Sequence, residues 1–261
     1  MFTNNFDPVA FEIFSLSIRW YSLAYIFGII FGWIYCKKIL IRNHIILKLF
    51  EDYISYLIIG IIIGGRLGYV IFYNFPYFLS NPIEIFMIWN GGMSFHGGLI
   101  GVIIFSYLFS KKYKKDVFIF LDLVSITAPI GILFGRISNF INGELVGKVT
   151  DTSWGVFFLN YDDKLRHPSQ LYEAFLEGVI LFILMNLIFF NKNYKVGTCS
   201  IMFLILYGLF RIIGEFFREP DIQIGYLFGN VSMGMLLSSI MIFIGFLIYF
   251  KRNDETKSQK I

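Results

Sequence analysis

Apolar residues fall into seven long runs along the chain, and short segments between them carry most of the charged residues. A helix of about 20 apolar residues is needed to cross the hydrocarbon core of a bilayer. The third run is the shortest and is rich in glycine, and its outer end is the least sharply marked. We therefore predict seven transmembrane helices, over residues 20–36, 53–73, 97–110, 117–135, 169–190, 196–217 and 226–250.

Basic residues alternate between the segments that separate these runs. Fourteen of the 22 Lys and Arg residues lie in the segments after the first, third, fifth and seventh runs. The positive-inside rule assigns such segments to the cytoplasm. The N-terminus is then outside and the C-terminus cytoplasmic, which agrees with an odd number of spans.

The complementary segments face the extracytoplasmic side and are rich in Pro, Trp, Asn and Gly. Residues 74–95 contain neither Lys nor Arg, but they include Tyr77 and Trp89, side chains suited to the headgroup layer. We expect short interface segments there.

Composition narrows the class of protein further. The chain of 261 residues is 57% hydrophobic and only 15% charged, which excludes a soluble domain and a disordered chain. Seven spans leave room for one transmembrane domain, catalytic if the chain is an enzyme, over residues 1–250, and for a disordered cytoplasmic tail over 251–261. Asp7 and Glu12 precede the first run without a basic region, so we expect no cleavable signal peptide.

Charged residues inside apolar spans are costly and therefore informative. We identify six: Arg66, Asp122, Arg136, Arg211, Glu215 and Arg218. At 1.5 Å per residue, all except Asp122 are expected in the outer half of the membrane, where His96 begins the third span. The polar chemistry is therefore predicted to converge on one layer near the outer headgroups.

The arginines at this depth suggest an anion site, because guanidinium groups bind phosphate through two hydrogen bonds. Phospholipid headgroups are the most abundant anions there. A purely structural role is an alternative for each arginine, and it is weakest for Arg136, which opens a dense polar run. Arg211 and Glu215 could neutralise each other, and Arg218 is expected to extend toward the interface. Arg66, among glycines that allow close helix packing, could form a structural tie to a neighbouring carboxylate.

Two polar runs carry candidate chemistry. Residues 135–144 combine Arg136 with Asn139 and Glu144, whose amide and carboxylate groups can bind phosphate oxygens, hydroxyls or arginine. Residues 91–101 place His96 between two Gly-Gly pairs, and an imidazole near a wet interface can accept a proton at neutral pH.

Two other histidines have structural interpretations. His167 precedes a helix for which Ser169 is a plausible N-cap, and His44 lies in a basic loop.

The chain lacks GxxxxGK[ST], HExxH and GxSxG motifs, and Cys36 and Cys199 indicate neither a disulfide framework nor a metal site. We expect no metal and no cofactor, and an enzyme of this composition would take its nucleophile from a second substrate.

Seven motif segments follow one another over some 200 residues: 19–21, 64–69, 73–76, 89–98, 135–144, 166–173 and 210–218. Together they closely resemble those of the prolipoprotein diacylglyceryl transferase family of bacterial membrane enzymes. The family's seven-span topology with an outside N-terminus is also the one predicted above. Ser138 stands where the family usually has glycine, and the outer segment 147–166 is short.

The resemblance implies transfer of the sn-1,2-diacylglyceryl group from phosphatidylglycerol to the thiol of a lipobox cysteine. The product is a thioether on the preprolipoprotein, with release of glycerol 1-phosphate, as the first step of lipoprotein maturation. The implied partners are phosphatidylglycerol, the preprolipoprotein signal peptide and membrane lipids, without nucleic acid. The chain would be a multi-pass protein of the bacterial cell membrane, the inner one in a Gram-negative cell, with its site on the extracytoplasmic side.

The resemblance also implies roles for residues around the phosphate. Arg136 would bind the headgroup phosphate, and Asn139 and Glu144 would shape that pocket. Gly147 would allow close approach. Arg211 would stabilise charge on the leaving phosphate.

Other residues would act on the nucleophile or the lipid. His96 would be the base for the thiol, or a positioning group, and Tyr21 would polarise or position the lipid. Arg66, Glu215 and His167 would make supporting contacts.

Two other classes of function remain open from the residues alone. A lipid flippase or anion transporter would need a polar track that continues to the cytoplasmic side, where Asp122 is the one clear charged candidate. A structural or partner-binding membrane protein would not require His96, Asn139 and Glu144 at one depth.

Overall fold

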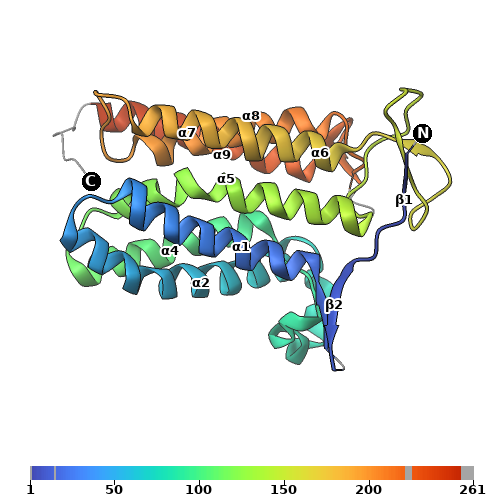
Figure 1. Ribbon diagram of the computed structural model, residues 1–261, viewed down its shortest axis with the longest axis horizontal. Helices are drawn as coiled ribbons and strands as arrows, with labels where there is room; N and C mark the ends of the chain where they lie inside the picture. Colours follow the sequence, from blue (N-terminus) through green and yellow to red (C-terminus); the bar gives the residue numbers. More distant parts are fainter. Residues whose placement is uncertain (1, 15, 221–224, 254–261) are drawn as a thin grey trace. The chain divides into compact units, whose positions relative to one another are not determined.

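The protein is mostly helical, as its apolar runs predict (Figure 1). The structure is a computed structural model that describes residues 2–14, 16–220 and 225–253. Residues 251–253 are helical, so the predicted disordered tail does not begin at residue 251, and from residue 254 onward it lies outside the described residues. The α-helices among the described residues are α1 (Trp20–Tyr35), α2 (His44–Phe72), α3 (Phe75–Ser80), α4 (Phe95–Tyr113), α5 (Val117–Asn142), α6 (Ser169–Glu173), α7 (Leu181–Phe189), α8 (Thr198–Glu215) and α9 (Met233–Asn253).

Two π-helical segments extend these helices. Cys36–Leu40 continues α1, and Ala174–Ile180 joins α6 to α7 into one long helical stretch. Such i→i+5 segments are rare, and they frequently occur at functional sites. The second one carries part of the site described below.

Short strands that were not predicted lie before α1, between α5 and α6, and before α9. The last two of them occupy the start of the predicted span 226–250, so that span was placed too early. Together the strands form one three-stranded sheet in the order β1-β4-β5, with β1 parallel to β4, and two antiparallel hairpins. The strands are β1 (Phe2–Asn4), β2 (Val9–Ile13), β3 (Leu16–Arg19), β4 (Val156–Phe158), β5 (Leu165–Arg166), β6 (Tyr226–Phe228) and β7 (Val231–Ser232).

The chain divides into two compact units. The larger unit comprises the residues up to Lys38 and those from Asp122 onward, and the smaller unit is Ile39–Leu121. The larger unit therefore contains most of α5 together with α1 and α6 to α9. The smaller unit is built on α2 and α4.

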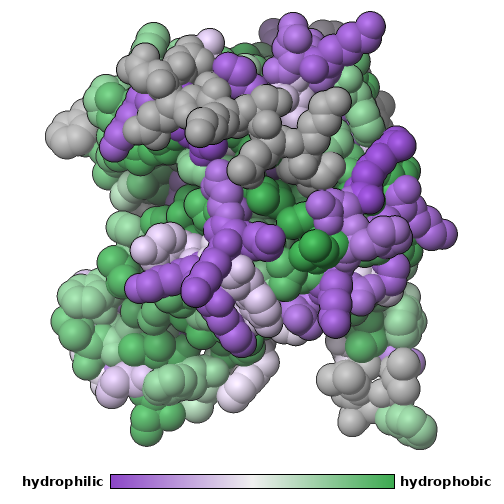
Figure 2. All heavy atoms as spheres, turned by 90° about the vertical axis from the view of Figure 1, so that its left-hand side faces the viewer, coloured by the Kyte–Doolittle hydropathy of each residue, from purple (hydrophilic) through white to green (hydrophobic). Residues whose placement is uncertain are grey.

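Six helical segments of the described chain are long and apolar enough to cross a membrane. They are Trp20–Leu40, His44–Phe72, Val117–Asn142, Ser169–Phe189, Thr198–Glu215 and Met233–Arg252. Figure 2, which looks onto helix ends, shows hydrophilic side chains gathered there and hydrophobic side chains around them. The chain is a polytopic helical membrane protein.

The remaining predicted span, 97–110, lies within α4. This helix has 19 residues, but its first turn contains His96 and two glycines and its last turn contains Lys111 and Lys112, and it is not among the six. The count of seven spans and the outside N-terminus stay predictions.

The predicted interface segment after α2 is made of short helical pieces in the smaller unit. After α3, two 3₁₀ turns span Pro82–Phe86 and Ile88–Asn90. Ile83, Phe86 and Trp89 are among the most exposed large apolar side chains of the described residues. Exposed apolar side chains of this kind suit the headgroup layer of a bilayer.

Helices α2 and α4 pack at very short distance in the smaller unit. Gly60, Gly64 and Gly68 of α2 face Gly97 and Gly101 of α4, and a Cβ on these glycines would overlap the backbone of the facing helix. Small residues let two helix backbones approach in this way. The contact confirms the expectation that the glycines around residue 66 allow close helix packing.

Asp122 is a fully buried carboxylate of α5 that anchors the start of α8 in the larger unit. Its Oδ1 accepts hydrogen bonds from the Ser200 backbone N–H at 2.7 Å and hydroxyl at 2.5 Å. Its Oδ2 accepts from the Gly197 N–H at 2.6 Å and from the Tyr194 hydroxyl. Gly197, the N-cap residue of α8, has no side chain to satisfy these amides, so Asp122 does so from another helix.

Replacing Asp122 by alanine is expected to destabilise the protein by about 2–3 kcal/mol, because two buried amides lose their acceptor. The measurement is thermal unfolding in detergent, monitored by the reaction of a fluorogenic maleimide with Cys36 and Cys199, which are both buried and free. Asp52→Ala, an exposed aspartate on α2, is the control. Equal melting temperatures for the two variants would contradict this role.

Candidate active site

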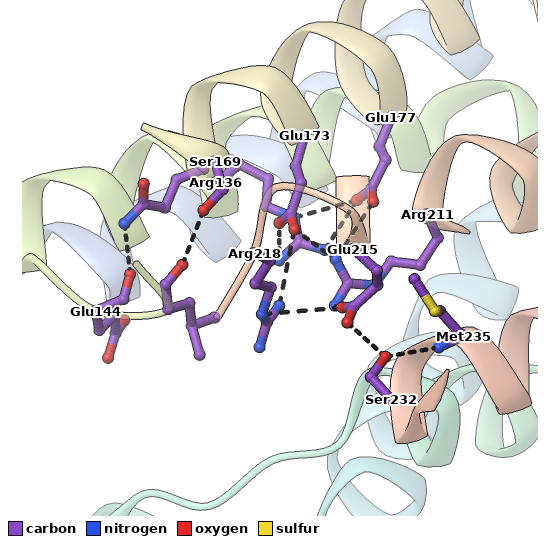
Figure 3. Close-up of polar contacts among 12 residues, drawn as sticks. Arg136, Glu144, Ser169, Glu173, Glu177, Arg211, Glu215, Arg218, Ser232 and Met235 are labelled. Atoms are coloured by element: carbon purple, nitrogen blue, oxygen red, sulfur yellow. Dashed lines mark hydrogen bonds and ion pairs between the residues drawn. The ribbon is translucent and has the colours of Figure 1, made fainter. Parts of the chain in front are cut away.

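Six charged side chains lie together in the interior of the larger unit (Figure 3). Three are arginines and three are glutamates, and each side chain is at most 13% exposed. They come from α5, from α6 and the π-helical segment after it, from α8, and from the turn that follows α8. This charged cluster consists of Arg136, Glu173, Glu177, Arg211, Glu215 and Arg218.

Arg136 bridges two carboxylates that are four residues apart on the helical stretch after residue 168. Its Nε and Nη2 donate to one oxygen, Glu177 Oε2, at 3.1 and 2.9 Å. Its Nη1 lies 2.8 Å from Glu173 Oε2. The edge of the guanidinium formed by Nε and Nη2 is thus occupied by Glu177.

Arg211 is the second centre of the cluster. Its Nη1 lies 2.6 Å from Glu173 Oε1 and 3.8 Å from Glu177 Oε1, and its Nη2 donates to Glu215 Oε1. The hydroxyl of Ser232 donates to the other oxygen of Glu215 at 2.6 Å. The expected pairing of Arg211 with Glu215 is confirmed, and it is part of a larger network.

Arg218 belongs to the cluster as well. Its Nη1 lies 3.9 Å from Glu173 Oε1 and its Nε 3.9 Å from Glu215 Oε1. Arg218 is only 6% exposed. The prediction that this arginine extends toward the interface is therefore wrong, because two carboxylates in the interior attract it more strongly than the protein surface.

Charge balance explains how so many ionised groups can be buried together. Removing one charge from water costs several kcal/mol unless an opposite charge with good hydrogen bonds compensates it. Three guanidinium groups and three carboxylates give the cluster no net charge when all are ionised. Removing any one member would leave an uncompensated charge in the interior.

Three glycines make room for this cluster. A Cβ on Gly214 would lie 2.9 Å from Glu173 Cγ, and one on Gly234 would lie 2.7 Å from Glu215 Oε1. A Cβ on Gly178 would lie 2.7 Å from the Cβ of Leu133 on α5. Larger residues at these positions would push the helices or the ionised side chains apart.

The polar run at the end of α5 forms a second, smaller set of contacts. The Asn139 Nδ2 donates to Glu144 Oε1 at 2.8 Å, and the Asn142 Nδ2 donates to the same oxygen at 3.1 Å. The Gln170 Nε2 donates to the backbone carbonyl of Glu144 at 2.8 Å. Asn139 and Glu144 are thus in direct contact, as expected of two residues that shape one pocket.

Gly147 provides close approach between two backbone segments. A Cβ there would overlap the carbonyl of His167, whose N–H donates to the Lys148 carbonyl at 3.0 Å. The Arg166 Nη1 donates to the Gly147 carbonyl at 2.8 Å. Arg166 also holds Asp162 and lowers the pKa of that carboxyl. A close approach of substrate to Gly147 stays a prediction.

His167 and Ser169 lie at the start of α6. The N-cap residue is Pro168, and the Ser169 hydroxyl donates instead to the Leu145 carbonyl at 3.3 Å, so the prediction of a Ser169 N-cap is wrong. His167 Nδ1 lies 3.2 Å from the Tyr172 hydroxyl. Partial burial lowers the pKa of His167, which favours its neutral form.

Arg66, in the smaller unit, is held by backbone carbonyls. Its guanidinium lies over the ring of Phe78, 5.0 Å from the centroid. All three guanidinium nitrogens donate to carbonyl oxygens, which belong to Glu84, Ile85, Met87, Gly91 and Gly92. These contacts fold the segment after α2 around the arginine. A direct contact of Arg66 with substrate stays a prediction.

His96 also belongs to the smaller unit, where it is buried in the first turn of α4. Ser94 caps that helix, since its hydroxyl accepts from the Gly97 N–H at 3.2 Å. The His96 ring packs edge-on against Phe95, with centroids 5.6 Å apart. Helix capping therefore sets the backbone position of the predicted base.

Tyr21 lies near the start of α1 in the larger unit. Its hydroxyl is 3.3 Å from that of Tyr25, and the two rings pack edge to face. The backbone of α1 is tied to α5, because the Ser138 hydroxyl donates to the Trp20 carbonyl at 3.3 Å. The serine hydroxyl at position 138 thus adds a contact between the two helices that glycine would lack.

The structure brings Arg136, Arg211 and Glu215 into one network and joins Asn139 to Glu144. Two members of the network, Glu173 and Glu177, were missed as site residues. Both lie inside the predicted span 169–190, so the count of six charged span residues was wrong. Because a charge inside a membrane span is costly, each carboxylate in that span should have been considered a candidate site residue.

These features define a class: a polytopic membrane protein with a buried, charge-balanced cluster rich in arginine, a group that binds phosphate well. The comparisons with known proteins are more specific. Residues 8–251 match the model of the family described as "Prolipoprotein diacylglyceryl transferase". The chain belongs to this family.

Similar proteins named phosphatidylglycerol--prolipoprotein diacylglyceryl transferase occur in several bacteria. The protein of Rickettsia bellii (strain OSU 85-389) is 50% identical over 252 residues, 95% of each chain. That of Rickettsia typhi is 48% identical over 98% of this chain and 100% of its own. That of Ehrlichia canis is 52% identical over 92% of this chain and 94% of its own.

Proposed function

We infer that this protein is a phosphatidylglycerol–prolipoprotein diacylglyceryl transferase. It transfers the diacylglyceryl group of phosphatidylglycerol to a prolipoprotein in lipoprotein maturation. Its partners are this lipid and the prolipoprotein, and it acts as a multi-pass membrane protein. The observation that carries the assignment is the buried network of Arg136 and Arg211 with three carboxylates, in a chain matched by the family over most of its length.

The reaction joins the sulfur of the lipobox cysteine to the terminal glycerol carbon that bears the phosphate. The bond between this carbon and its phosphate oxygen breaks, and glycerol 1-phosphate leaves with the electron pair. The thiol loses its proton, so one proton is released or passed to the leaving phosphate. The enzyme needs an anion site for the phosphate and a group that accepts the thiol proton.

Residues of the larger unit form the anion site for the phosphate. Arg136 binds the headgroup phosphate, and Arg211 stabilises the charge that develops on the leaving group. Both carry a planar guanidinium group with several hydrogen-bond donors in the buried interior. Asn139, Glu144 and Gly147 shape the pocket. Glu215 orients Arg211 through the contact of its Oε1 with Nη2.

The remaining roles belong to groups outside this network. His96 accepts the thiol proton, and Tyr21 positions the lipid. Arg66 supports the site indirectly, since its guanidinium donates to backbone carbonyls.

The membrane arrangement completes the proposal. The chain has seven spans, with α4 as the third, an outside N-terminus and a cytoplasmic C-terminus. The active site faces the extracytoplasmic side of the bacterial inner membrane, where both substrates meet it. Residues 1–250 act as one catalytic domain, and 251–261 form a cytoplasmic tail.

The test is incubation of the purified protein with phosphatidylglycerol micelles and a lipobox peptide with one cysteine. Mass spectrometry is expected to find a thioether-linked diacylglyceryl adduct. His96→Ala is expected to slow the reaction about a hundredfold or more, the usual contribution of a general base. His44→Ala, an exposed histidine of the smaller unit, is the control and should leave the rate unchanged.

No adduct from folded wild-type protein would refute the transferase assignment and turn attention to lipid transport in liposomes. A His96→Ala rate near that of the wild type would refute the base assignment alone. A moderate loss with an unchanged pH profile would make His96 a positioning group.

A further inference from the structure

The charge balance of the cluster has a consequence for the binding of phosphate. Arg136, Arg211 and Arg218 match Glu173, Glu177 and Glu215 in number. A phosphodiester brings one further negative charge into an interior where uncompensated charge is costly. One proton on a carboxylate of the cluster would restore the balance.

The three carboxylates differ in how well they are compensated. Glu173 contacts the guanidinium groups of three arginines, and Glu215 contacts two arginines and the Ser232 hydroxyl. Glu177 is fully buried, but only its Oε2 accepts hydrogen bonds, both from Arg136. Its Oε1 accepts no hydrogen bond from the described residues, and Arg211 Nη1 is 3.8 Å away. Glu173 Oε2 accepts no hydrogen bond either, but it lies only 2.8 Å from Arg136 Nη1. Glu177 is therefore the least compensated carboxylate.

Glu177 also occupies the position that the substrate needs. A phosphate binds an arginine best through two parallel hydrogen bonds from one edge of the guanidinium. At Arg136, the edge formed by Nε and Nη2 is bound to Glu177. Phosphate at this edge and ionised Glu177 would compete for the same donors.

The groups that face Glu177 come from three elements. Arg136 lies on α5, Glu173 at the end of α6, and Arg211 and Tyr207 on α8. Both arginines favour an ionised Glu177, whereas the neighbouring carboxylate of Glu173 opposes it. An anionic phosphate at Arg136 would add a second opposing charge and shift the balance toward a protonated Glu177.

We propose that Glu177 is a proton-linked positioning residue: it holds Arg136 in the free enzyme and takes up one proton when the lipid phosphate displaces it. This proposal rests on the proposed function, since it assigns the displacing anion to phosphatidylglycerol. The proton returns to solvent when glycerol 1-phosphate leaves and Glu177 pairs again with Arg136. The proton that the thiol loses is a different one, so uptake and release at Glu177 do not change the proton balance of the overall reaction.

The experiment measures proton uptake on binding of dihexanoyl phosphatidylglycerol, without a peptide acceptor. Calorimetric titration in two buffers with different ionisation enthalpies gives the number of protons taken up. We expect a value approaching one for the wild type, and a Kd that rises up to tenfold per pH unit where Glu177 is ionised in the free enzyme.

Glu177→Gln imitates the protonated carboxyl and should bind the lipid with almost no proton uptake and a Kd independent of pH. Glu51→Gln, an exposed glutamate of α2, is the control and should leave both lipid binding and proton uptake unchanged. Glu177→Asp retains a titrating carboxyl and should retain the uptake. It serves as a second variant if the glutamine variant does not fold.

Wild-type binding without proton uptake would overturn the proposal, and so would unchanged uptake in Glu177→Gln. The peptide adduct assay, run in parallel, separates this failure from that of the proposed function. An adduct formed without linked proton uptake refutes only the role of Glu177. The absence of both lipid binding and adduct would refute both.

Discussion

Replacing Arg136 by lysine is expected to reduce adduct formation by about a hundredfold to a thousandfold, the usual effect of removing one preorganised donor from an anion site. Lysine keeps the charge near Glu173 and Glu177. It cannot reproduce the two donors of Nε and Nη2 or the third contact from Nη1. The measurement is the initial rate of the peptide adduct by mass spectrometry at saturating lipid.

Arg136→Ala should be worse for stability, because breaking a buried ion pair from one side costs about 3–5 kcal/mol. A double variant, Arg136→Ala with Glu177→Gln, removes one charge of each sign and should recover much of that stability without recovering activity. This comparison separates folding from catalysis. A double variant with near wild-type activity would contradict the role of Arg136 at the phosphate.

Gly101→Ala is expected to destabilise the smaller unit by about 1–3 kcal/mol or more, the range for overpacked interiors. The new methyl group would overlap the Gly60 carbonyl and would lie 2.9 Å from Gly64 Cα, both parts of a rigid helix backbone. Helices α2 and α4 would have to separate. The measurement is the melting temperature in detergent, with an expected fall of about 2–12 °C.

Gly98→Ala is the matched control for this change. It lies on the same helix, three residues earlier, and its Cβ would meet only the Ile61 carbonyl at 3.8 Å, an ordinary contact. Alanine there should be neutral or slightly stabilising, because it favours the helix more than glycine does. Equal melting temperatures for the two alanine variants would contradict the prediction that a methyl group at Gly101 destabilises the contact between α2 and α4.

The sequence determines the class of the protein because hydrophobicity is a local property. Apolar runs of membrane length predict helices whatever their partners, and the runs 20–36, 53–73 and 196–217 correspond to α1, α2 and α8. Small residues predict close helix contacts for the same reason. The motif residues also identify the family, because each can be recognised without knowing its neighbours.

Two buried carboxylates inside a strongly apolar run were not recognised from the sequence. Glu173 and Glu177 fall in the predicted span 169–190, and both are almost completely buried. The average hydropathy of such a run conceals two carboxylates, although their cost is what makes them informative. The short strands were missed because two to five residues carry too little periodicity to be recognised.

The partners of the polar residues were decided only by the tertiary structure. Arg136 pairs with carboxylates about 40 positions away, Arg66 with the backbone of a folded loop, and Asp122 with amides of α8. The sequence states which side chains are charged and that burying them requires compensation. Which group compensates which depends on helix faces, a π-helical turn and glycines that let backbones meet, and these arise only when distant segments pack together.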